Sequence, residues 1–143
     1  MESLQHKPLV AIGEFTVPQH GALIERCILF ISNDTGPMHI GPAVGTPTLG
    51  LFGPEPLLRY RPYGSGHVAI YQPLECSPRI NIHLGPGGGC VNPVRHLCMK
   101  LITVESVWRE AQFQLEAVLA ACPACQGSQG MDGSAVRRRE RGA

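Results

Sequence analysis

Short apolar runs recur along the first half of the chain, and turn-forming residues bound each of them. The runs occupy residues 9–12, residues 28–31, Thr48–Phe52 and Val68–Tyr71. The run at residues 28–31 has no polar alternation, so we expect both of its faces to be buried, as in a parallel sheet. We predict a short strand at each run, and we expect the strand at residues 9–12 to be buried as well.

A helical pattern separates the first two runs. Thr16 is a suitable N-cap for a helix over residues 17–26, and Pro18 is tolerated in its first turn. One face of this helix is expected to pack inward. That face carries Leu23, Ile24 and Cys27.

The clearest helical pattern comes after a long segment rich in proline and glycine, residues 72–101, which we interpret as a loop. Thr103 is the expected N-cap, and Glu105 suits the positive end of the helix dipole. The helix should end near Ala121. One apolar stripe at helical spacing is expected to pack in the core: Val104, Val107, Trp108, Ala111, Leu115, Val118 and Leu119. The sequence of residues 122–143 is typical of a disordered tail.

The alternation of these strands and helices predicts the fold class. It favours an α/β protein with a partial Rossmann-like parallel sheet, helices on both of its faces and right-handed crossovers. In open sheets of this kind, ligands bind beyond the carboxyl ends of the strands.

One such strand end carries most of the candidate chemistry. A dense turn signal at residues 32–37 follows the strand predicted at residues 28–31. Pro37 then opens a predicted helix over residues 38–44, which Gly45 closes. A helix start at this edge offers free backbone N–H groups and the positive end of a dipole, a combination that suits phosphate.

Several residues at this turn suit a phosphorylated sugar. The Asp34 carboxylate can accept hydrogen bonds from sugar hydroxyls, and Thr35 offers a hydroxyl and an N–H. Gly36 lets the backbone approach a ligand closely. His39 lies about one helical turn farther on and can lean back over the helix start. If the next strand is a neighbour, Gly53 at its end forms a second close-approach loop on the same edge.

Other interpretations of these residues exist. Asp34 could simply cap the following helix. The cysteines and histidines of the long segment could bind zinc, but their spacing is irregular and no tight Cys-x-x-Cys pair occurs, so we expect no metal. These residues are Cys76, Cys90, Cys98, His83 and His96. Cys122 and Cys125 have the spacing of a redox motif but follow a helix rather than a strand, which favours idle thiols.

Composition limits the kinds of partner that the protein is expected to bind. The 143 residues carry a formal net charge of +1, which gives no electrostatic case for nucleic acid as a partner. No apolar run approaches the roughly 20 residues needed to span a bilayer. The first residues do not form a secretion signal, so the cysteines should be reduced and the location cytoplasmic.

Four segments, in order, resemble glycosyltransferase family 9, the heptosyltransferases of lipopolysaccharide core assembly. Three of them match its donor-binding signature, and the fourth matches the segment that ends the same domain. They are residues 30–39, residues 45–48, residues 51–54 and residues 98–107. The resemblance covers roughly residues 13–115. Gly41 and Pro42 depart from the family pattern and predict an early kink in the short helix.

The resemblance implies the C-terminal half of a two-domain GT-B glycosyltransferase. Residues 1–121 would then be a partial nucleotide-sugar-binding domain that holds a donor such as ADP-heptose for inverting transfer, without a metal or another cofactor. The acceptor would be a lipid-linked saccharide, which places the protein at the inner membrane as a peripheral protein. The donor-binding set that we predict is Asp34, Thr35, Gly36, Pro37, Met38, His39 and Gly53.

The same resemblance leaves the catalytic base to an N-terminal domain that has no counterpart in this sequence. A complementary domain on another chain could supply it, so we expect the chain to be an incomplete enzyme. Two alternatives stay open: a non-catalytic remnant, and a small nucleotide-binding module without transferase activity.

Overall fold

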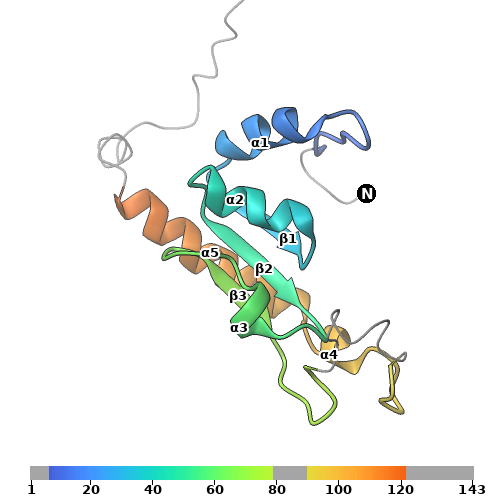
Figure 1. Cartoon of the computed structure of the whole chain (residues 1–143). Helices are drawn as coiled ribbons and strands as arrows, with labels where there is room; N and C mark the ends of the chain where they lie inside the picture. Colours follow the sequence, from blue (N-terminus) through green and yellow to red (C-terminus); the bar gives the residue numbers. More distant parts are fainter. Residues whose placement is uncertain (1–6, 79–89, 122–143) are drawn as a thin grey trace, which may run out of the picture.

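The chain folds around a three-stranded parallel sheet, seen here in a computed structural model that describes residues 7–78 and 90–121 (Figure 1). The strands are β1 (Phe30–Asn33), β2 (Thr48–Phe52) and β3 (Val68–Tyr71), in the order β1-β2-β3. The helical elements are α1 (Val17–Glu25), η1 (Gly36–His39), α2 (Ile40–Ala43), α3 (Leu57–Tyr60), α4 (Leu97–Lys100) and α5 (Val104–Ala121).

The predicted α/β class is confirmed. β1 and β3 both pair with β2 in parallel, with Phe30 opposite Thr48 and Leu49 opposite Val68. The strands predicted at Thr48–Phe52 and Val68–Tyr71 have the predicted bounds, and the first strand of the sheet begins two residues later than expected. Parallel pairing brings the carboxyl ends of all three strands to one edge of the sheet.

Helices lie on both faces of the sheet. Figure 1 shows α1 and α2 on one side and α5 crossing the other. On the α2 side, Met38 and Phe52 are fully buried. Leu49, whose side chain points to the opposite face because successive residues of a strand alternate, is also fully buried. The best-packed part of the molecule is therefore centred on β2.

Gly50 in β2 allows this close packing. A Cβ atom there would lie 2.7 Å from Phe52 Cε2 and 2.8 Å from Met38 Sδ. Because both partners are fully buried, we expect Gly50→Ala to destabilise the fold by about 1–3 kcal/mol. Gly36→Ala is the control, because no atom lies within 4 Å of the added Cβ. Urea denaturation would measure both, and equal midpoints for the two variants would contradict the expectation.

The strand predicted at residues 9–12 is wrong. These residues form no strand, and the exposed fraction of the side chain is 102% at Leu9, 60% at Val10 and 85% at Ile12. An apolar run becomes a strand only where a neighbour can complete its hydrogen bonds, and in the described residues β1 pairs with β2 alone.

The prediction that both faces of the first strand are buried is also wrong. Half-buried and exposed residues alternate along β1, and Ile31 is 45% exposed. β1 lies at the edge of the described sheet, so neighbours cover it on one flank only. In α1, the Thr16 N-cap is confirmed, but of the predicted inward face only Ile24 is buried, while Leu23 and Cys27 are exposed.

The last helix is confirmed as an element, but its core stripe is not. Thr103 Oγ1 accepts a hydrogen bond of 3.2 Å from the Ser106 N–H, as an N-cap does. Of the apolar stripe only Ala111 is buried, and Trp108 is 61% exposed. A groove of 440 Å³ separates α5 from the sheet. The helix therefore stands away from the sheet over part of its length. The spacing of apolar residues along the sequence does not contain that distance.

The long segment before α5 is more ordered than a plain loop. It contains α4 and an isolated bridge between Leu74 and Ser77, which the sequence analysis did not predict. His83 and residues 122–143, with the predicted tail and both of its cysteines, lie outside the described residues. No helix within the described part of the chain is both long and apolar enough to cross a membrane.

Candidate functional site

Asp34 sits where β1 leaves the sheet. Its backbone N–H donates to the Leu51 carbonyl at 3.1 Å, so it continues the ladder by one position beyond the strand. Thr35 follows in an extended conformation as the N-cap of η1. The chain therefore passes from strand to helix at the carboxyl edge within two residues, as predicted for a ligand-binding edge.

The helix after this turn differs from the predicted one. It begins as the 3₁₀ segment η1, in which the Met38 N–H donates to the Thr35 carbonyl at 3.0 Å, and continues as α2, which is only four residues long. Gly45 closes it with a φ of 79°. The tight first turn uses the Met38 N–H, which we expected to be free for a ligand, and Pro37 has no N–H group.

The predicted residues of this turn differ in what a ligand could reach. The Gly36 N–H makes no hydrogen bond within the described residues, and no atom lies within 4 Å of the place where a Cβ would be. The Met38 side chain is fully buried in the core, so a ligand can reach only its backbone. Thr35 and His39 are exposed. Gly36 is thus the best-placed backbone donor, and His39 is an accessible side chain at the end of η1.

Two buried carboxylate oxygens at this edge have no hydrogen-bond partner among residues 7–78 and 90–121. They are Oδ2 of Asp34 and Oε2 of Glu55. Burial raises the pKa of Asp34, and the positive charge of His39 partly opposes this rise. Burial also raises the pKa of Glu55, and the negative charge of Asp34 raises it further. The three side chains therefore share one electrostatic environment, and two of them hold unsatisfied acceptors.

Sequence reasoning gave Glu55 no role. It follows the Gly53-Pro54 turn that ends β2, and β2 is the neighbour of β1, so both carboxylates arrive at the same edge. The sequence held one signal for this pair. Glu55 lies three positions beyond the end of β2, and Asp34 directly follows the end of the neighbouring strand β1.

Gly53 has neighbours that account for its small size without a ligand. A Cβ atom there would lie 2.7 Å from Met99 Sδ and 3.8 Å from Cys98 Sγ. Its carbonyl accepts a hydrogen bond of 2.9 Å from Ser77 Oγ. Residues of the long segment therefore hold the turn after β2 in place. The role of Gly53 in ligand binding stays a prediction.

The raised pKa values predict how the site responds to pH. A carboxyl whose pKa rises on folding stabilises the native state while protonated, and that contribution is lost as the pH rises through the folded-state pKa. We therefore expect the double variant Asp34→Asn, Glu55→Gln to gain in Tm relative to wild type as the pH rises from about 4 to 7. His67, whose pKa burial lowers, acts in the opposite sense but equally in both proteins. Thermal scans across this range would measure the difference, and a constant or shrinking difference would contradict the assignment.

The alternative zinc site can be examined only in part, because His83 lies outside the described residues. Within residues 7–78 and 90–121, no group of three or more His, Cys, Asp or Glu side chains is arranged to hold a metal ion. Cys76 Sγ instead accepts a hydrogen bond of 3.3 Å from Asn92 Nδ2, and Cys90 Sγ accepts one of 3.2 Å from the His96 N–H.

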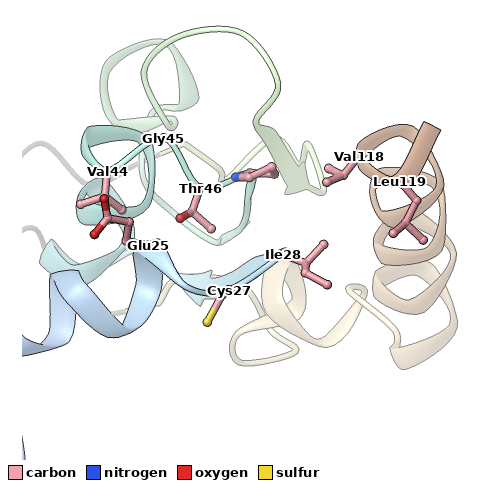
Figure 2. A pocket seen from close by; sticks show the side chains of 9 residues that line it. Glu25, Cys27, Ile28, Val44, Gly45, Thr46, Val118 and Leu119 are labelled. Carbon is pink, nitrogen blue, oxygen red and sulfur yellow. The ribbon is translucent and has the colours of Figure 1, made fainter. Parts of the chain in front are cut away.

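A second hollow of 210 Å³ lies at the opposite edge of the sheet (Figure 2). It is bounded by the end of α1, the start of the β1 segment, the turn before β2 and the last turns of α5. Its polar groups are largely used within the fold, because Thr46 Oγ1 donates to the Ile24 carbonyl at 2.8 Å and Cys27 Sγ donates to the Leu23 carbonyl at 3.4 Å. Nothing in it matches the unsatisfied carboxylates at the other edge.

Comparison with known proteins gives a consistent result. Residues 1–83 match the family model described as glycosyltransferase family 9 (heptosyltransferase). The chain is 37% identical over 71 residues to lipopolysaccharide heptosyltransferase 3 of Escherichia coli, a match that covers 49% of this chain and 21% of that protein. It is 36% identical over 67 residues to the lipopolysaccharide core heptosyltransferase OpsX of Haemophilus influenzae, covering 46% of this chain and 19% of that protein.

A solved structure extends the similarity. The crystal structure of a family 9 glycosyltransferase from Veillonella parvula matches with a TM-score of 0.60 and 29% identity, over 81% of this chain and 32% of that one. The chain spans about a fifth of the length of each of the two curated relatives named above.

Proposed function

Since the chain belongs to glycosyltransferase family 9, we propose that it is the region of a heptosyltransferase that binds the nucleotide-sugar donor. Residues 1–121 would form this region, as part of the C-terminal half of a GT-B enzyme. The relatives named as lipopolysaccharide heptosyltransferases support a heptose donor such as ADP-heptose and a lipopolysaccharide core acceptor.

The observation that carries the proposal is the pair of unsatisfied carboxylate oxygens of Asp34 and Glu55. A carboxylate oxygen that has no partner within the described residues is free to accept a hydrogen bond from a ligand hydroxyl. A nucleotide sugar carries several hydroxyls next to its diphosphate. Asp34 and Glu55 would accept from these hydroxyls, while the Gly36 N–H and His39 would face the diphosphate.

These positions also suit the chemistry of transfer. As the glycosidic bond to the diphosphate breaks, negative charge grows on the leaving nucleoside diphosphate, and fixed N–H groups and an imidazole N–H that donates a hydrogen bond stabilise it. The family resemblance supports inversion at the anomeric carbon without a metal. The base that activates the acceptor hydroxyl would come from another domain or chain, at the cytoplasmic face of the membrane that holds the acceptor lipid.

Titration calorimetry on the 143-residue chain tests this function. We expect saturable binding of ADP-heptose, with ADP alone binding more weakly because it lacks the sugar hydroxyls. Equal affinities would favour a nucleotide-binding module without sugar recognition. A folded sample that binds neither compound would support a non-catalytic remnant and overturn the proposal.

A further inference from the structure

His67 links the starts of two strands. It directly precedes β3, and its Nδ1 accepts a hydrogen bond of 3.2 Å from the N–H of Thr48, the first residue of β2. The imidazole thus takes the role that a backbone carbonyl has elsewhere in the sheet. Burial lowers the pKa of His67, which keeps the ring neutral at neutral pH. A neutral ring that accepts at Nδ1 carries its proton on Nε2, so Nε2 is a hydrogen-bond donor.

The Nε2 edge of this ring is open. Within residues 7–78 and 90–121, the only hydrogen bond of the His67 side chain is the one at Nδ1. Gly64 lies against the same edge, because a Cβ atom there would be 3.7 Å from both Nε2 and Cδ2 of His67. Gly64 has a φ of 102°, a conformation that favours glycine. The backbone of this loop therefore keeps side chains away from the free donor.

His67 lines a pocket of 310 Å³ that lies between α3 and the start of β3 (Figure 1). Arg61, which directly follows α3, is the charged residue of this pocket. No carboxylate of the described residues lines the pocket, and residues 56–74 contain no Asp or Glu. The other lining residues are glycine or apolar: Leu57, Leu58, Pro62, Gly64 and Ala69.

The two polar groups of the pocket both donate hydrogen bonds. A guanidinium has no acceptor, stays charged at all physiological pH values, and presents a planar fork that matches the oxygens of a phosphate. The Nε2–H of His67 adds a neutral donor whose tautomer is fixed by the Thr48 N–H. Because no acidic group competes for these donors, the pocket suits an anion that carries several oxygens.

We propose that this pocket binds a phosphate group, with Arg61 and the Nε2–H of His67 donating to its oxygens. The apolar walls would contact the molecule that carries the phosphate. Neither residue belongs to the proposed donor site, so the inference stands without that function.

The phosphate could be carried by a soluble ester or by a lipid. Two exposed side chains on the same stretch of chain suit a lipid surface: Leu58 is 93% exposed and Tyr63 is 89% exposed. The shared chemistry is the phosphate group, and the two sources differ in whether these side chains contribute to binding.

Binding at Nε2 has a specific consequence at Thr48. An anion that accepts from Nε2–H polarises the ring and makes Nδ1 a stronger acceptor, because hydrogen bonds in a chain reinforce one another. The amide proton of Thr48 should therefore shift downfield when the pocket fills. An anion bound elsewhere on the surface does not produce this response.

An NMR titration of the full 143-residue chain at neutral pH tests the site. We expect inorganic phosphate to shift the His67 imidazole and the Thr48 amide along one saturable curve. Arg61→Gln should weaken this binding by at least about tenfold, because it removes a charge-assisted hydrogen bond. Arg26→Gln is the matched control, because Arg26 is an exposed arginine at the C-cap of α1, and it should leave the curve unchanged.

Two further variants separate this site from the fold and from the donor site. His67→Asn keeps an acceptor for the Thr48 N–H but loses the Nε2 donor, so phosphate binding should weaken while the Tm stays close to that of wild type. Asp34→Asn should leave phosphate binding at the pocket unchanged. Failure of the donor-site proposal and failure of this one are therefore distinguishable.

Vesicles identify the source of the phosphate. If a lipid supplies it, the chain sediments with vesicles of phosphatidylglycerol and phosphatidylcholine, and Leu58→Ser reduces this sedimentation whereas Phe113→Ser, on exposed α5 surface, does not. If a soluble ester supplies it, inorganic phosphate gives the shifts and the vesicles do not bind. The proposal is overturned if neither probe shifts His67, if acetate shifts it as strongly as phosphate does, or if Arg61→Gln and Arg26→Gln weaken binding equally.

Discussion

Asp34→Asn is expected to weaken binding of a nucleotide-sugar donor by about 10–100-fold, the usual worth of a hydrogen bond to a charged group. The substitution keeps the shape of the side chain and removes its negative charge. A hydroxyl that donates to a carboxylate loses the stronger, charge-assisted part of that bond. Calorimetry with ADP-heptose would measure the change.

The same substitution should leave the fold at least as stable as wild type near neutral pH. Burial disfavours the charged form of Asp34, and that charge also raises the pKa of Glu55. Removing it therefore relieves a cost in the unliganded protein. The alternative in which Asp34 only caps the next helix has no support in the geometry, because Thr35 is the N-cap of η1 and no side chain makes a cap hydrogen bond there. A loss of binding without a loss of Tm would therefore assign Asp34 to ligand contact rather than to the stability of the fold.

Glu25→Gln is the matched control for Asp34→Asn. Glu25 is a carboxylate at the opposite edge of the sheet, beside the second hollow (Figure 2). Its neutralisation should leave donor affinity unchanged. If both variants lose affinity equally, the effect comes from overall charge, and Asp34 has no special position.

Phe52→Ala is expected to destabilise the chain by about 3–5 kcal/mol, the cost of removing a fully buried aromatic ring. Phe52 is fully buried at the end of β2 and lies among the few large side chains without exposed surface. Domains of this size are stable by about 5–15 kcal/mol, so the variant should be largely unfolded at modest denaturant concentrations.

Phe113→Ala is the matched control for Phe52→Ala. It removes the same ring from α5, where the side chain is 65% exposed, and should change stability by less than about 0.5 kcal/mol. Circular dichroism during urea titration would measure both variants. Similar losses for the two would show that the centre of packing is not around β2.

Some elements could be predicted because local patterns determine them. Thr48–Phe52 is bounded by Pro47 and Gly53 and has a buried place between two partners, so pattern and environment agree. Thr103 caps α5 through a hydrogen bond to a residue three positions later, which sequence spacing alone specifies.

Other features depend on distances between elements of the folded chain, which the spacing of residues in the sequence does not contain. The α5 stripe has helical spacing, but whether Trp108 is buried depends on how far the helix stands from the sheet. The turn around Asp34 was recognisable from its Gly-Pro pair and family resemblance. Glu55 was not, because its raised pKa comes from burial and from the Asp34 charge on the neighbouring strand, and its own neighbours in sequence indicate neither.

The hydrogen bond from Ser77 to the Gly53 carbonyl has a consequence for how the site could vary between related proteins. It anchors the peptide two residues before Glu55 to the segment around Ser77, which follows β3. A displacement of that segment, or of Met99 packed against the same glycine, would move the Glu55 carboxylate relative to Asp34. Substitutions in that segment would therefore change the spacing of the two carboxylates, and with it the pattern of hydroxyl groups that the proposed donor site accepts, while Asp34 and Glu55 themselves stay the same.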